Sequence, residues 1–160
     1  MMMVRSGAIA LPAIAAAMVL AGCTDETTGS EETLTLTESN KGSHFAPIGE
    51  AIAAHDPPGT GFAISIPLQD SSKQTVGEIN AVCIATKPSP EPVLYGTCSG
   101  TADVPEGQLG ITQGGTIGDN TSGAPGAIVG GTGKYEGATG RFTSKLSGER
   151  IQDTFNITLP

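Results

Sequence analysis

The sequence predicts an all-β protein whose short antiparallel strands close into an eight-stranded barrel. Apolar and polar residues alternate in about eight short segments between residues 33 and 160, which is the period of strands. Glycine-rich turns separate these segments, above all within residues 127–141, because a sharply turning backbone uses conformations that glycine adopts freely. No convincing amphipathic helix pattern occurs in this region. Evenly spaced strands with glycine turns are typical of a barrel or a sandwich, and we interpret the pattern as a barrel.

Residues 1–22 have the pattern of a bacterial secretion signal. A basic start at Met1–Arg5 precedes the apolar run Ala8–Leu20, which is too short for a comfortable membrane span. The ending Leu-Ala-Gly-Cys resembles a lipobox, in which the Cys23 thiol takes a diacylglyceryl group and Cys23 becomes the new N-terminus, with palmitate as a typical acyl chain. We therefore expect a lipoprotein held on the outer side of the bacterial cell membrane. The alternative is an ordinary signal peptide with an incidental cysteine.

The predicted mature chain begins with an acidic linker. Residues 24–32 (TDETTGSEE) contain no apolar side chain, so we expect residues 23–32 to be a disordered tether to a single domain at 33–160. Removal of residues 1–22 takes away the charge of Arg5 and changes the net charge from −8 to −9. An acidic chain without a basic cluster argues against nucleic acid as a partner and against electrostatic attachment to an anionic membrane.

The alternation places each expected strand in turn. The strands are Thr33–Glu38, Gly61–Leu68, Thr75–Thr86, Val93–Ala102, Gly107–Gln113, Ala127–Val129, Ala138–Leu146 and Arg150–Leu159. In the first strand Leu34, Leu36 and Glu38 share one face, and in the last strand Ile151, Asp153, Phe155, Ile157 and Leu159 do so. Pro67 indicates an edge or a bulge near the end of the second strand. Between strands we expect an irregular segment at Asn40–Pro58, with a helical turn around Ile48–Ala54, and a long loop at Gly114–Gly126.

Two cysteines remain in the predicted mature chain beyond Cys23, and their spacing predicts a disulfide. Cys83 and Cys98 lie on strand-like segments that flank the proline-rich loop Lys87–Pro92. A hairpin folded about the middle of that loop places residue 83 opposite residue 98, within the Cα separation that a disulfide spans. The compartment outside the membrane permits such bonds.

The motif GGTGKYEGATGR at Gly130–Arg141, placed before a closing hairpin, resembles the allene oxide cyclase/dirigent barrel family. The strand GTCSGT at Gly96–Thr101, PEGQL at Pro105–Leu109 and ITQG at Ile111–Gly114 support the resemblance, which covers residues 33–159. The resemblance implies an eight-stranded barrel with an apolar cavity, often trimeric. Members of this family include cofactor-free cyclases of lipid-like or polyketide-like molecules and proteins that steer the coupling of phenolic radicals.

The resemblance also suggests site residues. The cyclase pattern assigns catalytic positions to Glu38, Asn40 and Pro47, and places Asp70, Cys83 and Thr116 at ligand-binding positions. Asp70 stands where the family has asparagine, and Thr116 stands where it has tyrosine.

Glu38 has two interpretations. If the face that it shares with Leu34 and Leu36 points inward, its carboxylate lies in an apolar barrel, where desolvation raises the pKa and suits the group to acid–base work. The alternative is a solvated carboxylate at the barrel rim.

Other chemistries leave no convincing pattern. The segment at Gly131–Lys134 lacks the spacing of a phosphate-binding loop, and His44 and His55, with Glu50 and Asp56, match no standard metal-ligand spacing. We therefore expect no metal and no cofactor. The absence of a GxSxG element argues against a serine hydrolase site.

Three functions fit the sequence. The first is a membrane-anchored barrel that binds a small apolar ligand, and the second is a cofactor-free cyclase or isomerase that uses Glu38 and Asn40. The third is a packed, oligomerising barrel without a cavity. An open interior with Glu38 inside favours the second.

Overall fold

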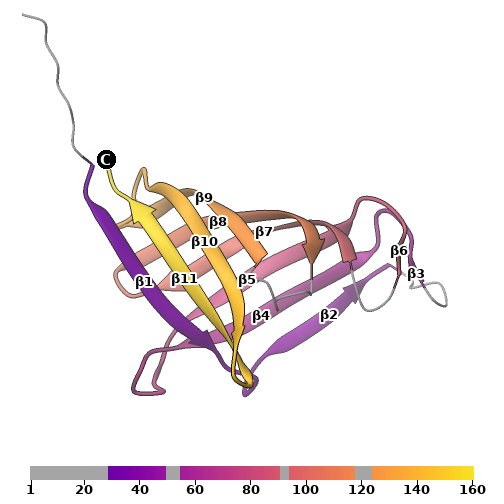
Figure 1. The fold of residues 1–160 in the computed structure, drawn as a ribbon, viewed down its shortest axis with the longest axis horizontal. Helices are drawn as coiled ribbons and strands as arrows, with labels where there is room; N and C mark the ends of the chain where they lie inside the picture. The colour runs from indigo at the N-terminus through magenta and orange to yellow at the C-terminus, as the bar shows by residue number, and fades with distance from the viewer. Residues whose placement is uncertain (1–28, 50–54, 91–93, 118–123) are drawn as a thin grey trace, which may run out of the picture.

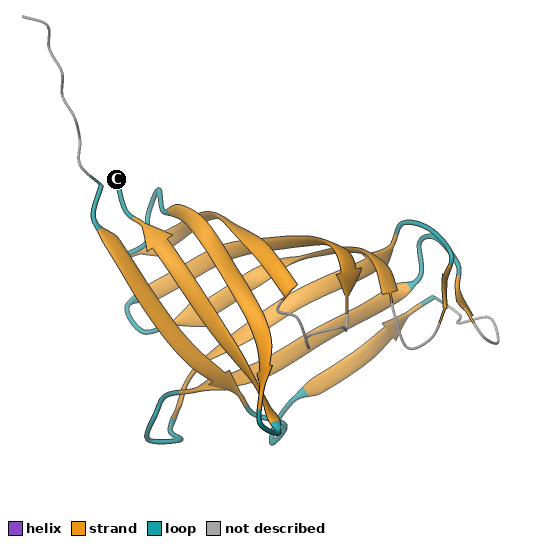
Figure 2. Cartoon of the chain, viewed as in Figure 1, coloured by secondary structure: helices purple, strands orange, loops and turns teal. Residues whose placement is uncertain are grey.

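The chain folds into a closed antiparallel barrel with one extra strand. The computed structural model describes residues 29–49, 55–90, 94–117 and 124–160, and within them it contains strands and turns but no helix (Figure 2). Eight strands pair edge to edge in the order β1-β11-β10-β9-β8-β7-β5-β4, and β1 pairs with β4 to close the sheet (Figure 1). This confirms the predicted fold class.

Neighbouring strands of the barrel are mostly neighbours along the chain, so short connections suffice to build it. The wall consists of β1 (Glu31–Glu38), β4 (Gly61–Gln69), β5 (Thr75–Ala85), β7 (Leu94–Val104), β8 (Gly107–Ile117), β9 (Ala124–Gly133), β10 (Thr139–Ser147) and β11 (Arg150–Thr158). Three shorter strands lie outside this closed sheet. Strand β2 (His44–Ile48) pairs with the start of β4, and β3 (His55–Asp56) pairs with β6 (Ser89–Pro90).

Two expected loops are partly wrong. The expected loop Gly114–Gly126 contributes its first four residues to β8 and its last three to β9, and only residues 118–123 lie outside the described residues. The irregular segment Asn40–Pro58 contains β2, and most of the helical turn expected around Ile48–Ala54 falls on residues 50–54, which are also outside them. The sequence did not predict β2 or these ends of β8 and β9, because glycine, threonine and proline interrupt the alternation of apolar and polar residues there.

Strand β4 is shared between two partners on one of its edges. Its C-terminal end pairs with β1 and its N-terminal end pairs with β2, so the chain changes direction between them at residues 39–43. The Pro67 carbonyl accepts a hydrogen bond from the Ser39 N–H at 2.9 Å. The backbone polar groups of residue 67 therefore face the bend at residues 39–43. A residue there loses little by lacking an N–H, which explains how a proline fits a strand in the barrel wall.

The core fills the barrel toward the end where β1 begins. Its buried apolar residues are Leu36, Leu68, Ile79, Ala102, Val104, Leu109, Ile111, Ile128, Tyr135, Ala138, Phe142, Phe155 and Ile157. These positions alternate with exposed ones along β8 and β11, as one-sided burial of a sheet requires. The face predicted to be shared by Asp153, Phe155 and Ile157 in the last strand is the inward one, because all three are buried.

The glycine-rich motif forms the turn between β9 and β10, as predicted. Gly133 and Gly137 have φ angles of +63° and +73°, which side chains disfavour, and they bracket the turn. Between them Tyr135 folds back into the core, where it is 1% exposed, and its hydroxyl donates to the Pro105 carbonyl at 3.2 Å. The motif therefore closes this end of the barrel.

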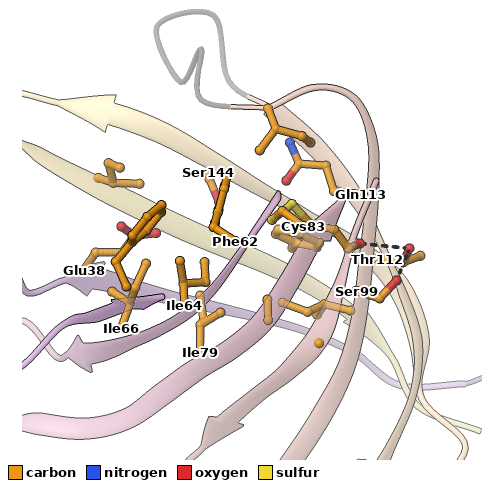
Figure 3. Close-up of a pocket in the computed structure, with 18 residues that line it drawn as sticks. Glu38, Phe62, Ile64, Ile66, Ile79, Cys83, Ser99, Thr112, Gln113 and Ser144 are labelled. Carbon is orange, nitrogen blue, oxygen red and sulfur yellow. Dashed lines mark hydrogen bonds between the residues drawn. A yellow bond between two sulfur atoms is a disulfide. The ribbon is translucent and has the colours of Figure 1, made fainter. Parts of the chain in front are cut away.

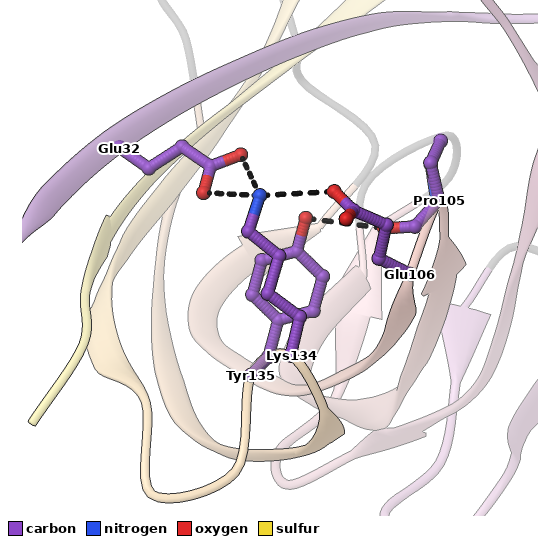
Figure 4. A network of polar contacts seen from close by, with 5 residues as sticks. All are labelled: Glu32, Pro105, Glu106, Lys134 and Tyr135. Carbon is purple, nitrogen blue, oxygen red and sulfur yellow. Dashed lines mark hydrogen bonds and ion pairs between the residues drawn. The ribbon is translucent and has the colours of Figure 1, made fainter.

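The start of β1 is held against this turn by a lysine. Lys134 Nζ lies 2.9 Å from a Glu32 carboxylate oxygen and 3.0 Å from one of Glu106 (Figure 4). Glu31 and Glu32 pair with Thr158 and Ile157 of β11. The expected tether at residues 23–32 is thus wrong at its C-terminal end, because backbone pairing with β11 and the Lys134 contacts order the two glutamates.

Glycine at position 126 makes room for the Phe142 ring. The two residues pair across β9 and β10, and a Cβ atom at Gly126 would overlap the ring. We expect Gly126→Ala to lower the free energy of unfolding by about 1–3 kcal/mol, since the ring must leave its place in the core. Gly114→Ala is the control, because its Cβ would meet nothing closer than Thr97 Cγ2 at 3.9 Å. Equal urea midpoints for the two variants would contradict this explanation.

Candidate functional site

An apolar pocket opens at the end of the barrel away from the Tyr135 turn. It has a volume of about 220 Å³, so the barrel is not filled throughout. Its wall is formed by inward-facing side chains of consecutive strands, which the strand register arranges in layers. Phe62, Cys83, Cys98 and Gln113 form one layer, and Ile64, Ala81, Gly100 and Ile111 form the next (Figure 3).

Two small residues make the space. Ala81 on β5 and Gly100 on β7 are directly paired in the middle of the wall, and larger residues precede and follow them on the inward face. A Cβ atom at Gly100 would clash with the backbone of β5 at residues 80 and 81. The close approach of these two strands therefore requires glycine, and glycine leaves the pocket unfilled there.

Glu38 lies where the packed core meets the pocket. It is the last residue of β1, it pairs with Leu68 of β4, and it lines the pocket beside Ile64 and Ile66 (Figure 3). Two residues earlier, Leu36 pairs with Asp153 of β11. Because residues two apart share a face and diagonal neighbours across strands are within reach, the two carboxyl groups come together inside the barrel.

Asp153 is fully buried and has an unusual hydrogen-bond environment. Ser144, which pairs with it across β10 and β11, donates its hydroxyl to Asp153 Oδ1. No nitrogen or hydroxyl donor among the described residues reaches Asp153 Oδ2, although this atom is also buried. Ionised carboxylates only accept, so a protonated Glu38 carboxyl beside Asp153 is the kind of donor that this buried oxygen requires.

Burial, the charge of Asp153 and the hydrogen bond between the two groups raise the pKa of Glu38 from 4.5 to about 8. Burial also raises the pKa of Asp153 from 3.8 to about 6, against the hydrogen bonds from Ser144 and Glu38, which favour its ionised form. At neutral pH the pair therefore holds one proton and one negative charge, as close carboxyl pairs do. A carboxylic acid that stays protonated at pH 7 in an apolar pocket can donate a hydrogen bond or a proton.

The other end of the pocket carries the disulfide and an aromatic pair. Cys83 and Cys98 are directly paired on β5 and β7 and form the predicted bond. Beside them Phe62 stacks on Phe45 of β2, with ring centroids 5.0 Å apart. Phe45 is 66% exposed although it lines the pocket, so β2 places an aromatic ring at the open side.

The remaining residues suggested by the family resemblance do not join Glu38. Asn40 and Pro47 are exposed, on the bend after β1 and on β2, and Thr116 is exposed on β8. Asp70 lies in the turn after β4, where its Oδ1 accepts from the Ser72 hydroxyl and from the backbone of Ser72 and Gln74, which lowers its pKa. None of these four lines the apolar pocket.

Sequence reasoning missed Asp153 and Ser144 as members of the site. The alternation puts Asp153 on one face with Ile151 and Phe155, but its nearness to Glu38 follows only from pairing between the first strand and the last. The available signal was a carboxylate between Ile151 and Phe155 on an otherwise apolar face, since a buried charge there needs a partner.

In the described part of the chain, no group of three or more histidine, cysteine, aspartate or glutamate side chains comes together. His55 and Asp56 belong to β3, and Glu50 lies outside the described residues. Among the residues described there is also no apolar helix of membrane-spanning length.

Comparison with known proteins places the chain by its fold. No family model matches the sequence, and no curated protein sequence does so either. The barrel fold is similar to that of dirigent proteins and of cyclases of the Diels–Alderase type.

Three solved structures illustrate this class. A pyocyanin demethylase is 21% identical with a TM-score of 0.65, over 79% of this chain and 100% of that one. The Diels–Alderase AbmU from Streptomyces koyangensis is 12% identical with a TM-score of 0.58, over 79% of this chain and 63% of that one. The dirigent protein PsPTS1, a pterocarpan synthase, is 18% identical with a TM-score of 0.51, over 81% of this chain and 94% of that one. At these identities the likeness establishes the fold alone.

Proposed function

We propose that the protein is a cofactor-free cyclase or isomerase that binds a small apolar molecule in the barrel and acts on it through the Glu38 carboxyl group. The observation that carries this proposal is the Glu38 carboxyl group on the wall of an apolar pocket, next to the buried Asp153 carboxyl, where burial and Asp153 together raise the pKa of Glu38. Structural neighbours with the same barrel include cyclases, which supports this choice of reaction class.

The chemistry needs only the groups already in the pocket. The Glu38 O–H donates to an oxygen of the substrate as a C–O bond lengthens, and the negative charge retained by the pair stabilises the cation that develops on the carbon skeleton. The apolar wall folds the substrate chain so that its reacting carbons meet. As the ring closes and the oxygen becomes a carbonyl, the proton returns to Glu38, so the product is an isomer. Asp153, held by Ser144, acts as a positioning residue for Glu38.

Filling the pocket should weaken ligand binding. We expect Ala81→Leu to weaken binding of the neutral dye N-phenyl-1-naphthylamine at least about tenfold, since its side chain enters the space beside Gly100. Val82→Leu is the matched control, because the neighbouring residue of the same strand is 43% exposed and lies on the outer face. Fluorescence titration measures both variants. Equal dye affinity for Ala81→Leu and wild type would contradict the pocket as binding site.

Glu38 should direct the stereochemistry of ring closure. With the methyl ester of an unstable fatty-acid allene oxide, we expect wild type to give one cyclopentenone enantiomer in excess. We expect Glu38→Gln to leave the product racemic, since its amide cannot supply the acidic proton. Chiral chromatography of the product measures this. Racemic product from both proteins would exclude cyclase activity on this class of epoxide.

A second candidate is a binding protein without catalysis. It is favoured by the positions of Asn40 and Pro47, which the family resemblance assigns to the catalytic set and which lie exposed outside the pocket. On this proposal the same apolar pocket holds a ligand unchanged. Dye binding that responds to Ala81→Leu, together with racemic product from wild type, distinguishes this candidate from the cyclase.

The cellular setting is proposed from the N-terminal sequence. Residues 1–28 lie outside the described residues, and the pattern before Cys23 supports lipid attachment there and a place on the outer side of the bacterial cell membrane. A homotrimer is proposed from family resemblance. Mass spectrometry of the mature N-terminus tests the lipid, and an unmodified Cys23 would exclude it.

A further inference from the structure

The carboxyl pair formed by Glu38, on the pocket wall, and Asp153, buried next to it, lacks a positive partner. Of the residues that line the pocket, Glu38 is the only one with a charged side chain, and no lysine, arginine or histidine contributes to the pKa of Glu38 or Asp153. The ion pairs found among the described residues join Lys134 to Glu32 and Glu106, at the opposite end of the barrel. At neutral pH the pair therefore keeps a negative charge in apolar surroundings.

The basic residues closest in sequence to Ser144 and Asp153 do not contact the carboxyl pair. Arg150, at the start of β11, donates from Nη1 to Gln69 Oε1 on the exposed surface at 3.1 Å. Lys145, next to Ser144 on β10, is exposed and pairs with Gln152 rather than Asp153. Around the pair itself the facing side chains are Leu36 of β1, Leu68 of β4 and Ser144 of β10, none of which is basic.

A buried charge without a partner is costly, and a ligand that brings the opposite charge removes the cost. On the basis of the proposed function, we propose that the substrate or ligand is an apolar molecule with a single basic nitrogen, and that the Glu38–Asp153 pair holds this nitrogen as a cation. The rings of Phe62 and Phe142, which also line the pocket, are neutral surfaces that tolerate a cation. A carboxylate ligand meets repulsion and no basic partner there.

Three small molecules with the same alkyl chain test this selection in wild-type protein. Isothermal titration at pH 7.5 compares octylamine, 1-octanol and octanoate, which are cationic, neutral and anionic. We expect octylamine to bind at least about tenfold more tightly than 1-octanol, and octanoate to bind most weakly. We also expect the octylamine affinity to rise between pH 6 and pH 8, because Asp153 completes its ionisation and Glu38 begins to ionise in this range, while the 1-octanol affinity stays constant.

Two variants assign the selection to the pair. Asp153→Asn removes the retained charge, and we expect it to reduce the preference for octylamine over 1-octanol to less than about threefold. Glu149→Gln, which removes an exposed charge in the turn between β10 and β11, should keep the wild-type preference. If Asp153→Asn does not fold, Glu38→Gln replaces it, with loss of the pH dependence as the expected result.

The outcomes separate this inference from the proposed function. If 1-octanol binds and octylamine binds equally or more weakly, the proposed selection for a cation is overturned, but the apolar pocket is still supported as a ligand site. Octanoate as the tightest ligand also overturns the selection. If none of the three molecules binds, the selection fails together with the proposed ligand site.

Discussion

Stability should fall as the pH rises from 5 to 9, which is unusual for a protein with 16 acidic residues. The pKa values of Glu38 and Asp153 in the folded chain, about 8 and about 6, exceed their ordinary values of 4.5 and 3.8. The folded state therefore binds more protons than the unfolded state, and this contribution is complete below about pH 4 and is lost as the pH passes the folded values. We expect a loss on the order of 3 kcal/mol, because a pKa change of one is worth about 1.4 kcal/mol and solvent screens half-buried Glu38 in part.

Urea unfolding at pH 5, 6.5, 8 and 9 measures this loss. Glu38→Gln should remove most of the slope and be more stable than wild type at pH 8, because glutamine stays neutral. Glu149→Gln, exposed in the β10–β11 turn, should keep the wild-type slope. A wild-type free energy of unfolding that varies by less than about 0.5 kcal/mol across this range would contradict the buried pair.

Removal of the disulfide should destabilise the barrel by about 3 kcal/mol. The bond closes a loop between residues 83 and 98, a separation of 15 residues, and such a constraint on the unfolded chain is worth about this amount. The double variant Cys83→Ala, Cys98→Ala should unfold at correspondingly lower urea concentration. Alanine is chosen at both positions because Cys83 is 1% exposed and a polar replacement would add a separate cost.

A reductant provides the internal control for the disulfide. It should lower the urea midpoint of wild type toward that of the double variant and leave the double variant unchanged. A loss below about 1 kcal/mol in the double variant would mean that the paired strands β5 and β7 already restrict the chain as much as the bond does.

The sequence was sufficient for the barrel and for the disulfide, because both follow from local patterns. Alternation identified the long strands, and the hairpin spacing placed Cys83 opposite Cys98. Strand β2 (HFAPI) was missed because its residues do not alternate and most are exposed, so its presence depends on the free edge of β4 rather than on its own composition.

The site could be predicted only in part. The shared face of Leu34, Leu36 and Glu38 left two positions open for Glu38, inside the barrel or at its solvated rim, and the structure places it on the pocket wall. Its partner Asp153 is 115 residues away along the chain, and only the closure of β1 on β11 brings the two together. Asn40 was assigned by resemblance, and it lies outside because the chain bends away from the barrel directly after β1.

The measurement that tests the central claim most directly is the titration of the Glu38 side-chain carboxyl carbon by NMR. In protein labelled with ¹³C at glutamate and aspartate carboxyl carbons, the Glu38 resonance, assigned by its absence in Glu38→Gln, should shift with a midpoint near pH 8, while the Asp153 resonance shifts near pH 6. A Glu38 midpoint near its ordinary value of 4.5 would show that the two groups share no proton, and the proposed acid chemistry would then have no source.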